Sequence, residues 1–327
     1  MKNIILPTLL LLLTLTAGCN QKKAGAELPM EKVIEQSIEV AELQAKAMAE
    51  QLLKKDSLLP RTIDKETGEL ITSDSRWWTS GFFPGTLWYL FELTEDKQLK
   101  NFAEEYTLRI EREKHTTDNH DVGFMLYCSF GNGLRITGDK NHADVLIKGS
   151  ESLSTRFNPE VGLIRSWDWN AEKWQYPVII DNMMNLELLM WAFQYTGDST
   201  FRNIAVSHAD KTLKHHFRDD HSSYHVVSYD TITGKPHFKG THQGAADASI
   251  WSRGQSWGLY GYTMMYRETG KEKYLSQAIN IADMLIDHPN MPKNKIPYWD
   301  FLAPEIPNTL RDASAAAIMA SALIELS

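Results

Sequence analysis

The amino-acid sequence predicts an all-α protein in which helical hairpins follow one another around a ring. Mostly apolar helices alternate with helices that are charged on one face, and a short polar turn joins each pair. No alternating strand pattern is long enough for a central sheet. Because the turns are unevenly spaced, a closed ring fits better than an open solenoid, which has a fixed period. We therefore expect an inner ring of buried helices within an outer ring of amphipathic ones.

The first residues have the pattern of an export signal. Lys2 is followed by an apolar run from Ile4 to Leu15, which is too short to span a bilayer. Small residues then precede Cys19, as in bacterial lipoprotein signals. The pattern supports export more firmly than lipid attachment, because Thr16 stands where an aliphatic residue is usual.

We accordingly predict three segments. Residues 1–18 form a lipoprotein-type signal peptide, 19–30 form a polar tether that begins at an acylated Cys19, and 31–327 form the helical domain. The expected location is the periplasm of a Gram-negative bacterium, with or without a lipid anchor in the membrane.

Four polar turns divide the domain into helix pairs. After a first amphipathic helix at 31–53, the turns are Thr94-Glu-Asp96, Thr137-Gly-Asp139, Thr196-Gly-Asp198 and Thr269-Gly-Lys271. Burial-type helices are expected before them at 80–93, 121–136, 181–195 and 250–267, and amphipathic helices after them at 97–113, 140–156, 199–216 and 271–287.

Long connections enter the apolar helices at their N-terminal ends. They cover 54–79, 157–180, 217–249 and 289–312, so they should gather on one face, where sites are commonly built. Aromatic side chains around a pocket suit a sugar ring, which offers C–H faces and hydroxyls. The connections are rich in such residues: Trp77, Trp78, Trp167, Trp169, Trp174, His225, His242, Trp251, Arg253 and Trp257.

Two carboxylates stand at the start of burial-type helices. Asp121 begins one helix and Asp181 begins another, so both should lie at one rim. Asp181 could serve simply as a helix cap, but the repetition favours acid and base roles in glycoside hydrolysis. The helix dipoles favour the charged forms, whereas burial favours the neutral forms. The sequence leaves that balance open.

Other chemistries find less support. The formal charge of -8, from 34 Lys and Arg against 42 Asp and Glu, disfavours nucleic acid and anionic membranes as partners. The histidines at 215, 216, 221 and 225 lack a metal-ligand spacing, and Gly131-Asn-Gly133 lies within a helical segment. We expect no metal and no cofactor.

Several segments together resemble one enzyme family. They are Trp78-Thr-Ser-Gly-Phe-Phe-Pro-Gly85, His120-Asp-Val-Gly-Phe-Met-Leu-Tyr127, Ile180-Asp-Asn-Met-Met-Asn185, His242-Gln243, Trp251-Ser-Arg-Gly-Gln-Ser-Trp257 and Arg311-Asp-Ala-Ser314. The combination resembles the unsaturated glucuronyl hydrolases of glycoside hydrolase family 88, over nearly everything from residue 31 onward.

The resemblance implies an (α/α)6 barrel and a substrate made by polysaccharide lyases, an oligosaccharide that ends in a 4,5-unsaturated uronic acid. Water adds across the vinyl ether double bond, and the hemiketal opens and releases the next sugar. By motif match, Asp181 protonates C4 and helps to deprotonate the water, while Asp121 binds hydroxyls and tunes Asp181. The implied substrate-binding residues are Trp78, His225, His242, Gln243, Trp251, Arg253 and Trp257. We expect Arg253 to lie in the pocket as a cation near the uronate, outside any core ion pair.

Two expectations remain open at this point. The pattern accounts for about five helix pairs before Ser327, so we expect a truncated barrel that lacks its last pair. The alternatives to glucuronyl hydrolysis are an unsaturated rhamnogalacturonyl hydrolase, a sugar-binding lipoprotein without turnover, and an inactive remnant.

Overall fold

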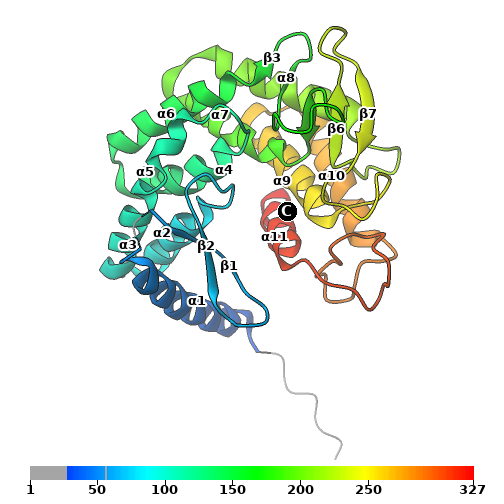
Figure 1. The fold of residues 1–327 in the computed structure, drawn as a ribbon. Helices are drawn as coiled ribbons and strands as arrows, with labels where there is room; N and C mark the ends of the chain where they lie inside the picture. The colour runs from blue at the N-terminus through cyan, green and yellow to red at the C-terminus, as the bar shows by residue number, and fades with distance from the viewer. Residues whose placement is uncertain (1–27, 56) are drawn as a thin grey trace, which may run out of the picture.

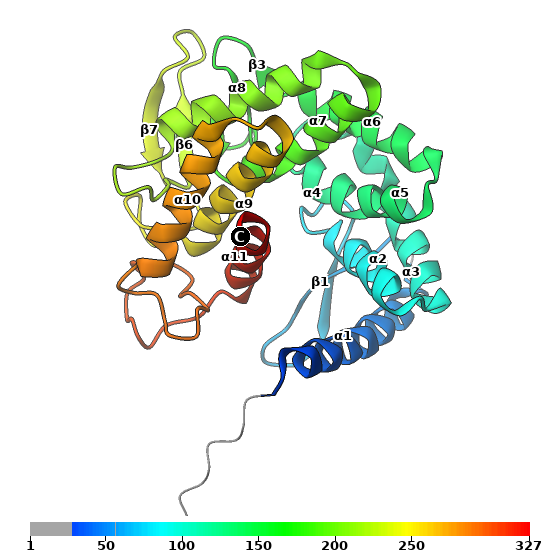
Figure 2. The ribbon, with the colours of Figure 1, turned by 180° about the vertical axis from the view of Figure 1, so that it is seen from behind.

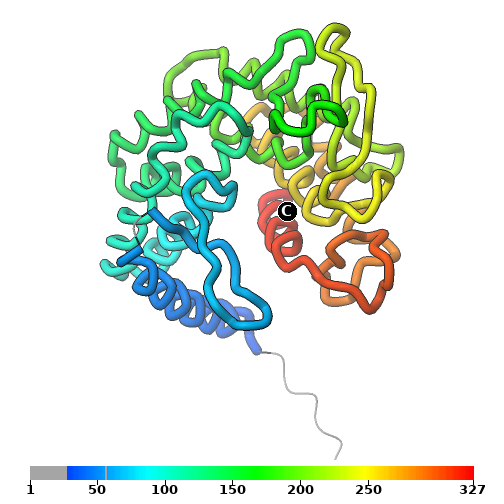
Figure 3. The backbone as a smooth tube through the Cα atoms, in the orientation of Figure 1, coloured from blue at the N-terminus to red at the C-terminus, as the bar shows by residue number. Residues whose placement is uncertain are grey.

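A computed structural model describes residues 28–327 except residue 56, so the predicted signal peptide and Cys19 lie outside the described residues. The described chain forms an arc of helical hairpins in two layers (Figures 1 and 3). The inner layer contains α2 (Phe82–Thr94), α4 (Val122–Leu126), α5 (Asn132–Thr137), α7 (Asn182–Thr196), α9 (Ser252–Thr269) and α11 (Ala313–Leu326). The outer layer contains α1 (Met30–Leu52), α3 (Lys97–Leu108), α6 (Lys140–Ser154), α8 (Ser199–His215) and α10 (Glu272–Asp287).

The four polar turns join inner to outer helices as predicted, and one hydroxyl organises each turn. The Oγ1 atom of Thr196 donates to the carbonyl of Ala192 at 2.7 Å and accepts from the amide of Asp198 at 3.1 Å. Gly197 has a φ of +77°, and Asp198 caps α8 by accepting from the amide of Thr200. The threonines at 94, 137 and 269 make the same two hydrogen bonds.

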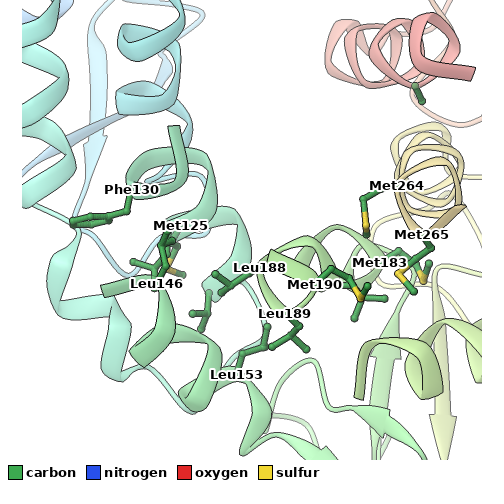
Figure 4. Packing of buried hydrophobic residues seen from close by; sticks show 14 of the residues in the cluster. Met125, Phe130, Leu146, Leu153, Met183, Leu188, Leu189, Met190, Met264 and Met265 are labelled. Atoms are coloured by element: carbon green, nitrogen blue, oxygen red, sulfur yellow. The ribbon is translucent and has the colours of Figure 1, made fainter. Parts of the chain in front are cut away.

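Helix α7 is buried on both sides, in agreement with its apolar sequence. Figure 4 shows Met183 and Met190 facing Met264 and Met265 of α9, while Leu188 lies toward the preceding inner and outer helices. These five side chains are at most 1% exposed. In Figure 2 α7, α9 and α11 lie on the inner side of the arc, and α8 and α10 lie outside them.

The predicted helix at 121–136 is interrupted. It consists of α4, a π-helical turn from Tyr127 to Gly131 (η2), and α5. A π turn places one extra residue in the helix and is frequent near functional sites. A short 3-10 helix, η1 (Glu111–His115), follows α3.

Three small antiparallel sheets lie in the long connections, and one of them leads into the site. Strand β5 ends just before Asp181 and β6 begins just after His225, so the pairing of Ile179 with Val226 brings these two site residues together. The strands are β1 (Leu59–Ile63), β2 (Leu70–Ser73), β3 (Phe157–Asn158), β4 (Leu163–Ile164), β5 (Pro177–Ile179), β6 (Val226–Tyr229) and β7 (Pro236–Gly240).

The arc begins at α1 and ends at α11 (Figure 1). Helix α11 packs mainly on α9, and α1 packs on α2. Among the described residues, no helix combines the length and apolar character needed to cross a membrane.

Candidate active site

The two predicted carboxylates both stand at the N-cap positions of inner helices. Asp121 precedes α4 and Asp181 precedes α7. Within the described chain, neither side chain accepts a hydrogen bond from the amides of the first helical turn. The capping interpretation of Asp181 is therefore wrong, although the outer-helix aspartates at 96, 139 and 198 do cap.

Contacts between α4 and α7 hold the two carboxylates at one rim. Asn185 on α7 accepts a hydrogen bond from the amide of Phe124 through its Oδ1 atom, at 2.9 Å. The close approach of the two helices requires glycine at position 123, because a Cβ atom there would lie 2.6 Å from the Cα atom of Asn185. Asn182 anchors the start of α7 by donating to the carbonyl of Ile164 at 3.0 Å. The Asp-Asn-Met-Met-Asn segment thus joins one carboxylate to its structural supports.

Burial outweighs the helix dipoles at both carboxylates. Burial raises the pKa of Asp181 to about 7, against an opposing effect of the Arg253 charge. Burial also raises the pKa of Asp121 to about 7, and the nearby Asp181 carboxylate adds to this rise. Burial thus outweighs the opposing effects, and both carboxyl groups change protonation state close to neutral pH.

Each carboxylate has a neutral histidine beside it. The Nε2 atom of His120 lies 3.3 Å from Oδ1 of Asp121, and burial lowers the pKa of His120 to about 3. The Nε2 atom of His225 lies 3.7 Å from Oδ2 of Asp181, and burial lowers the pKa of His225 well below its usual range. Near neutral pH the two carboxyl groups can therefore gain and lose protons, whereas both imidazoles stay uncharged and serve as hydrogen-bonding neighbours.

Backbone amides determine which nitrogen of His225 carries its proton. The Nδ1 atom accepts from the amides of His242 and Gln243, at 3.0 and 3.1 Å. A nitrogen that accepts hydrogen bonds carries no proton in the neutral ring, so the proton is on Nε2 and faces Asp181. The His225 ring also packs on Trp251, with the ring centroids 4.6 Å apart.

Two buried polar atoms that face each other at this rim are unpartnered. Among residues 28–327 other than 56, Oδ2 of Asp181 and Nε2 of His225, which lie 3.7 Å apart, have no hydrogen-bond partner. Buried polar groups in proteins are nearly always hydrogen-bonded, so orphaned atoms that share one site point to a ligand.

The predicted aromatic residues divide between the site and the core. Trp78 and Trp257 both contact the ring of Phe124, at centroid distances of 5.6 and 5.0 Å. Trp174 is 1% exposed and packs on Phe238, so it belongs to a core cluster.

A second aromatic group lies beside His242. Trp167 and Trp169 stack at 4.7 Å with an interplanar angle of 9°, and His242 contacts both rings. Trp169 remains 48% exposed, which suits a face offered to a sugar. This pair was not among the substrate-binding residues expected from the resemblance, although the Trp-Asp-Trp spacing could have indicated it.

Arg253 differs from its expectation. Its Nη1 atom pairs with Oδ2 of Asp312 at 2.7 Å, and its Nη2 atom donates to Oε1 of Gln243 at 3.0 Å. The guanidinium lies 4.6 Å from the centroid of Trp251. The expectation excluded an ion pair in the core, whereas this pair is part-buried and lies at the acidic N-cap of α11, so Asp312 is a partner that the sequence did not indicate. Arg253 does lie among the expected pocket residues, between Gln243 and Trp251.

The histidine run is dispersed. His215 and His216 end α8, and His216 is completely buried. The described residues contain no cluster of three or more His, Cys, Asp or Glu placed to hold a metal ion.

An apolar cavity of about 750 Å³ lies between the inner helices. Phe82, Trp191, Trp257 and Ile318 contribute to its lining, whereas the lining contains neither Asp121 nor Asp181. Trp257 thus lines this cavity and also packs on Phe124 of α4, the helix that begins at Asp121.

Proteins of known function are similar in sequence to most of this chain. An unsaturated glucuronyl hydrolase from Formosa agariphila is 53% identical over 253 residues, which are 77% of this chain and 63% of that protein. An unsaturated chondroitin disaccharide hydrolase from Streptococcus agalactiae is 36% identical, over 77% of this chain and 64% of that protein. The chain therefore spans less than two thirds of the length of these relatives.

Solved structures give the same result. The crystal structure of an unsaturated glucuronyl hydrolase specific for heparin superimposes with a TM-score of 0.87 and 46% identity, over 90% of this chain and 78% of that one. The enzyme from Bacillus sp. GL1 gives a TM-score of 0.81 and 32% identity, over 88% and 77%. The predicted (α/α)6 barrel class is confirmed. The family model of Glycosyl Hydrolase Family 88 matches residues 54–268, and the chain belongs to that family.

Proposed function

We propose that this protein hydrates the double bond of 4,5-unsaturated uronic acids at the non-reducing end of lyase-generated oligosaccharides and so releases the adjacent sugar. Family membership and the names of the relatives support this reaction. The observation that carries it is Asp181, a buried carboxyl group whose pKa is raised to about 7 by burial and whose Oδ2 atom is unpartnered within the described chain. An acid with this pKa is still partly protonated at neutral pH, so it can donate its proton to the substrate and can act as a base afterwards.

The proposed reaction uses Asp181 twice. Its proton goes to C4 while a water oxygen bonds to C5, and the carboxylate that results takes a proton from the water. The C5 hemiketal then opens by breaking its bond to the ring oxygen. This makes C5 a ketone and leaves C1 as a hemiacetal that bears a hydroxyl and the adjacent sugar. The hemiacetal collapses to an aldehyde by breaking the C1–O bond to that sugar, and the hydroxyl proton goes to the leaving oxygen. His225 presents its Nε2 proton toward Asp181 at 3.7 Å and stabilises the carboxylate form.

Asp121 and its neighbours have supporting roles in this proposal. Asp121 binds sugar hydroxyls, and the charge that Asp181 carries after it gives up its proton raises the pKa of Asp121, so the two carboxyl groups do not readily ionise together. Trp78 and Trp257 supply aromatic faces near Phe124, and Trp251 supports the ring of His225.

A polar group beside His225 contains His242, Gln243 and Arg253. Because Oε1 of Gln243 accepts from Arg253, its amide nitrogen is free to donate to a substrate oxygen. Asp312 neutralises part of the Arg253 charge, so we assign uronate binding to Gln243 and Arg253 together.

The test is turnover of unsaturated disaccharides prepared with lyases from chondroitin, hyaluronan and heparin, followed by loss of the ultraviolet absorbance of the double bond. We expect turnover by the wild type and a loss of about 10²-fold or more in kcat for Asp181→Asn, with binding retained. Asp121→Asn should also be severe. Binding without turnover by the wild type would contradict the proposal and favour a sugar-binding protein.

We also propose that the protein is exported and attached to a membrane through Cys19, on the pattern of residues 1–19. Mass spectrometry of the membrane fraction should find acylated Cys19 as the first residue. In a Cys19→Ala variant the protein should leave the membrane fraction, and an unprocessed wild-type N-terminus would contradict the assignment.

A further inference from the structure

Asp300 is a fully buried carboxylate that no part of the proposed reaction uses. It lies in the connection between α10 and α11 and is 0% exposed. Its Oδ2 atom accepts from the amide of Ala245 at 3.0 Å and the hydroxyl of Ser249 at 2.6 Å. Its Oδ1 atom accepts from the amides of Ile250 at 3.2 Å and Leu302 at 2.9 Å. Four donors thus satisfy a group that would be costly to bury alone.

Three of these donors belong to the loop of residues 241–250, which joins β7 to α9. Inside the loop, the amide of Thr241 donates to Asp247 at 2.9 Å and the amide of Gly244 donates to the hydroxyl of Thr241 at 2.7 Å. A Cβ atom at Gly244 would lie 2.7 Å from two hydroxyls and 3.1 Å from Oδ2 of Asp300. The loop backbone at Gly244 therefore packs closely against Asp300.

This loop is also the one that determines the protonation of His225. The amides of His242 and Gln243 donate to Nδ1 of His225, which leaves the proton on Nε2, 3.7 Å from Asp181. A shift of the loop by about 1 Å would break both hydrogen bonds, because N–H···O and N–H···N contacts weaken beyond ~3.2 Å. The ring could then carry its proton on Nδ1, with a lone pair facing Asp181.

The segment that carries Asp300 has separate backbone attachments to the start of α9 and to the end of the loop. The amide of Ser252 in α9 donates to the carbonyl of Trp299 at 3.1 Å, and the amide of Phe301 donates to the carbonyl of Ile250, the last residue of the loop, at 2.9 Å. Because these backbone pairs do not involve the Asp300 side chain, changing the carboxylate should release residues 241–249 while the segment stays attached at Ile250 and Ser252.

We propose that Asp300 is a positioning residue: it holds the loop of residues 241–250 so that two backbone amides keep the proton of His225 on Nε2, facing Asp181. The two hydrogen bonds to Nδ1 of His225 are sufficient to assign its tautomer. Its effect on catalysis rests on the proposed function, in which His225 stabilises the carboxylate form of Asp181.

The test is Asp300→Asn in the full-length protein. Asparagine has the same size, but its NH₂ group replaces one carboxylate oxygen. That group would face the donors whose hydrogen bonds this oxygen accepts in the wild type. Nitrogen-15 histidine NMR distinguishes the two tautomers, and a His225→Gln variant identifies the His225 signals. We expect a protonated Nε2 in the wild type and a mixture of tautomers in Asp300→Asn. We also expect kcat on an unsaturated disaccharide to fall by about 10-fold or more while KM changes less, since misplacement by ~1 Å can cost about 10²-fold.

Two further variants separate positioning from stability. Asp230 accepts from the amides of Ile232 and Thr233 in the turn between β6 and β7, at the other end of β6 from His225. Asp230→Asn should lower Tm and leave the tautomer and kcat unchanged. Ser249→Ala removes one of the four hydrogen bonds of Asp300, so it should shift the tautomer in the same direction by a smaller amount. Ser249→Ala decides the question if Asp300→Asn does not fold.

The outcomes are distinct. An unchanged Nε2 tautomer in folded Asp300→Asn, or in Ser249→Ala where the first variant does not fold, would overturn the proposal. A changed tautomer with unchanged kcat would overturn its catalytic part. If the wild type turns over no unsaturated disaccharide, the proposed function fails, while the NMR result still decides the role of Asp300.

Discussion

Replacement of Asp181 by asparagine should make the protein more stable above neutral pH while it removes catalysis. In the unfolded chain this carboxyl group ionises near its usual pKa of about 3.9. In the folded protein burial raises its pKa to about 7. Asparagine has the same shape and does not ionise, so it lacks the cost of a buried charge.

The sign of the pH dependence follows from proton binding. Below about pH 4 the carboxyl group is protonated in both states, so its raised pKa has no cost there. As the pH rises from about 4 to about 7, the unfolded state loses this proton and the folded state keeps it, so the wild type loses stability. Above about pH 7 both states are ionised and the loss is constant.

The magnitude follows from the two pKa values. The rise from the ordinary value of 3.8 to about 7 corresponds to about 4 kcal/mol, at ~1.4 kcal/mol for each tenfold change in acidity. Urea unfolding of both proteins between about pH 4 and about pH 8 measures the difference. The stability of Asp181→Asn relative to the wild type should increase across this range by as much as about 4 kcal/mol.

Asp198→Asn is the matched control, because Asp198 holds the same N-cap position on α8 but has a lowered pKa. Its hydrogen bond from the amide of Thr200 favours the carboxylate. Its contribution to stability is present above the unfolded pKa and is lost as the pH falls, so the gap between Asp198→Asn and the wild type should close in acid. A stability difference for Asp181→Asn that stays flat from about pH 4 to about pH 8 would refute the reasoning.

Three further predictions concern the same site. Gly123→Ala should lower the free energy of unfolding by about 1 to 3 kcal/mol and also lower kcat, since its Cβ would lie 2.6 Å from a Cα atom of α7. The control is Gly138→Ala, at φ +72° with nothing within 4 Å of its Cβ, which should lower Tm and retain kcat. Equal losses of kcat in the two variants would contradict this assignment. Arg253→Ala should raise KM and also lower Tm, because it removes the ion-pair partner of the part-buried Asp312 carboxylate. An unchanged KM would make Arg253 purely structural. The rate kcat/KM should fall as the pH rises above about 7, where Asp181 loses its proton, and a pH-rate profile that is flat there would show that another group is the acid.

Local chemistry explains why the helix boundaries could be predicted from the sequence. The Thr-Gly-Asp turns contain their own stop and start signals: a hydroxyl that bonds within four residues, a glycine at positive φ and an aspartate cap. The apolar character of α7 on all sides likewise indicated a buried helix, and both of its flanks are packed. These features depend on neighbours in the chain, so the sequence contains the required information.

The chemistry of the site depended on contacts between distant residues. Asp121 and Asp181 were identified from their helix starts, but the direction of their pKa shifts required the burial that only packing produces. The tautomer of His225 required amides 17 and 18 residues away, and the ion pair of Arg253 required Asp312, 59 residues away. The sequence by itself determined the helix pairs, the turns and the candidate carboxylates. Only the tertiary structure decided their protonation and partners, because desolvation and hydrogen-bond geometry arise when segments far apart in the chain pack together.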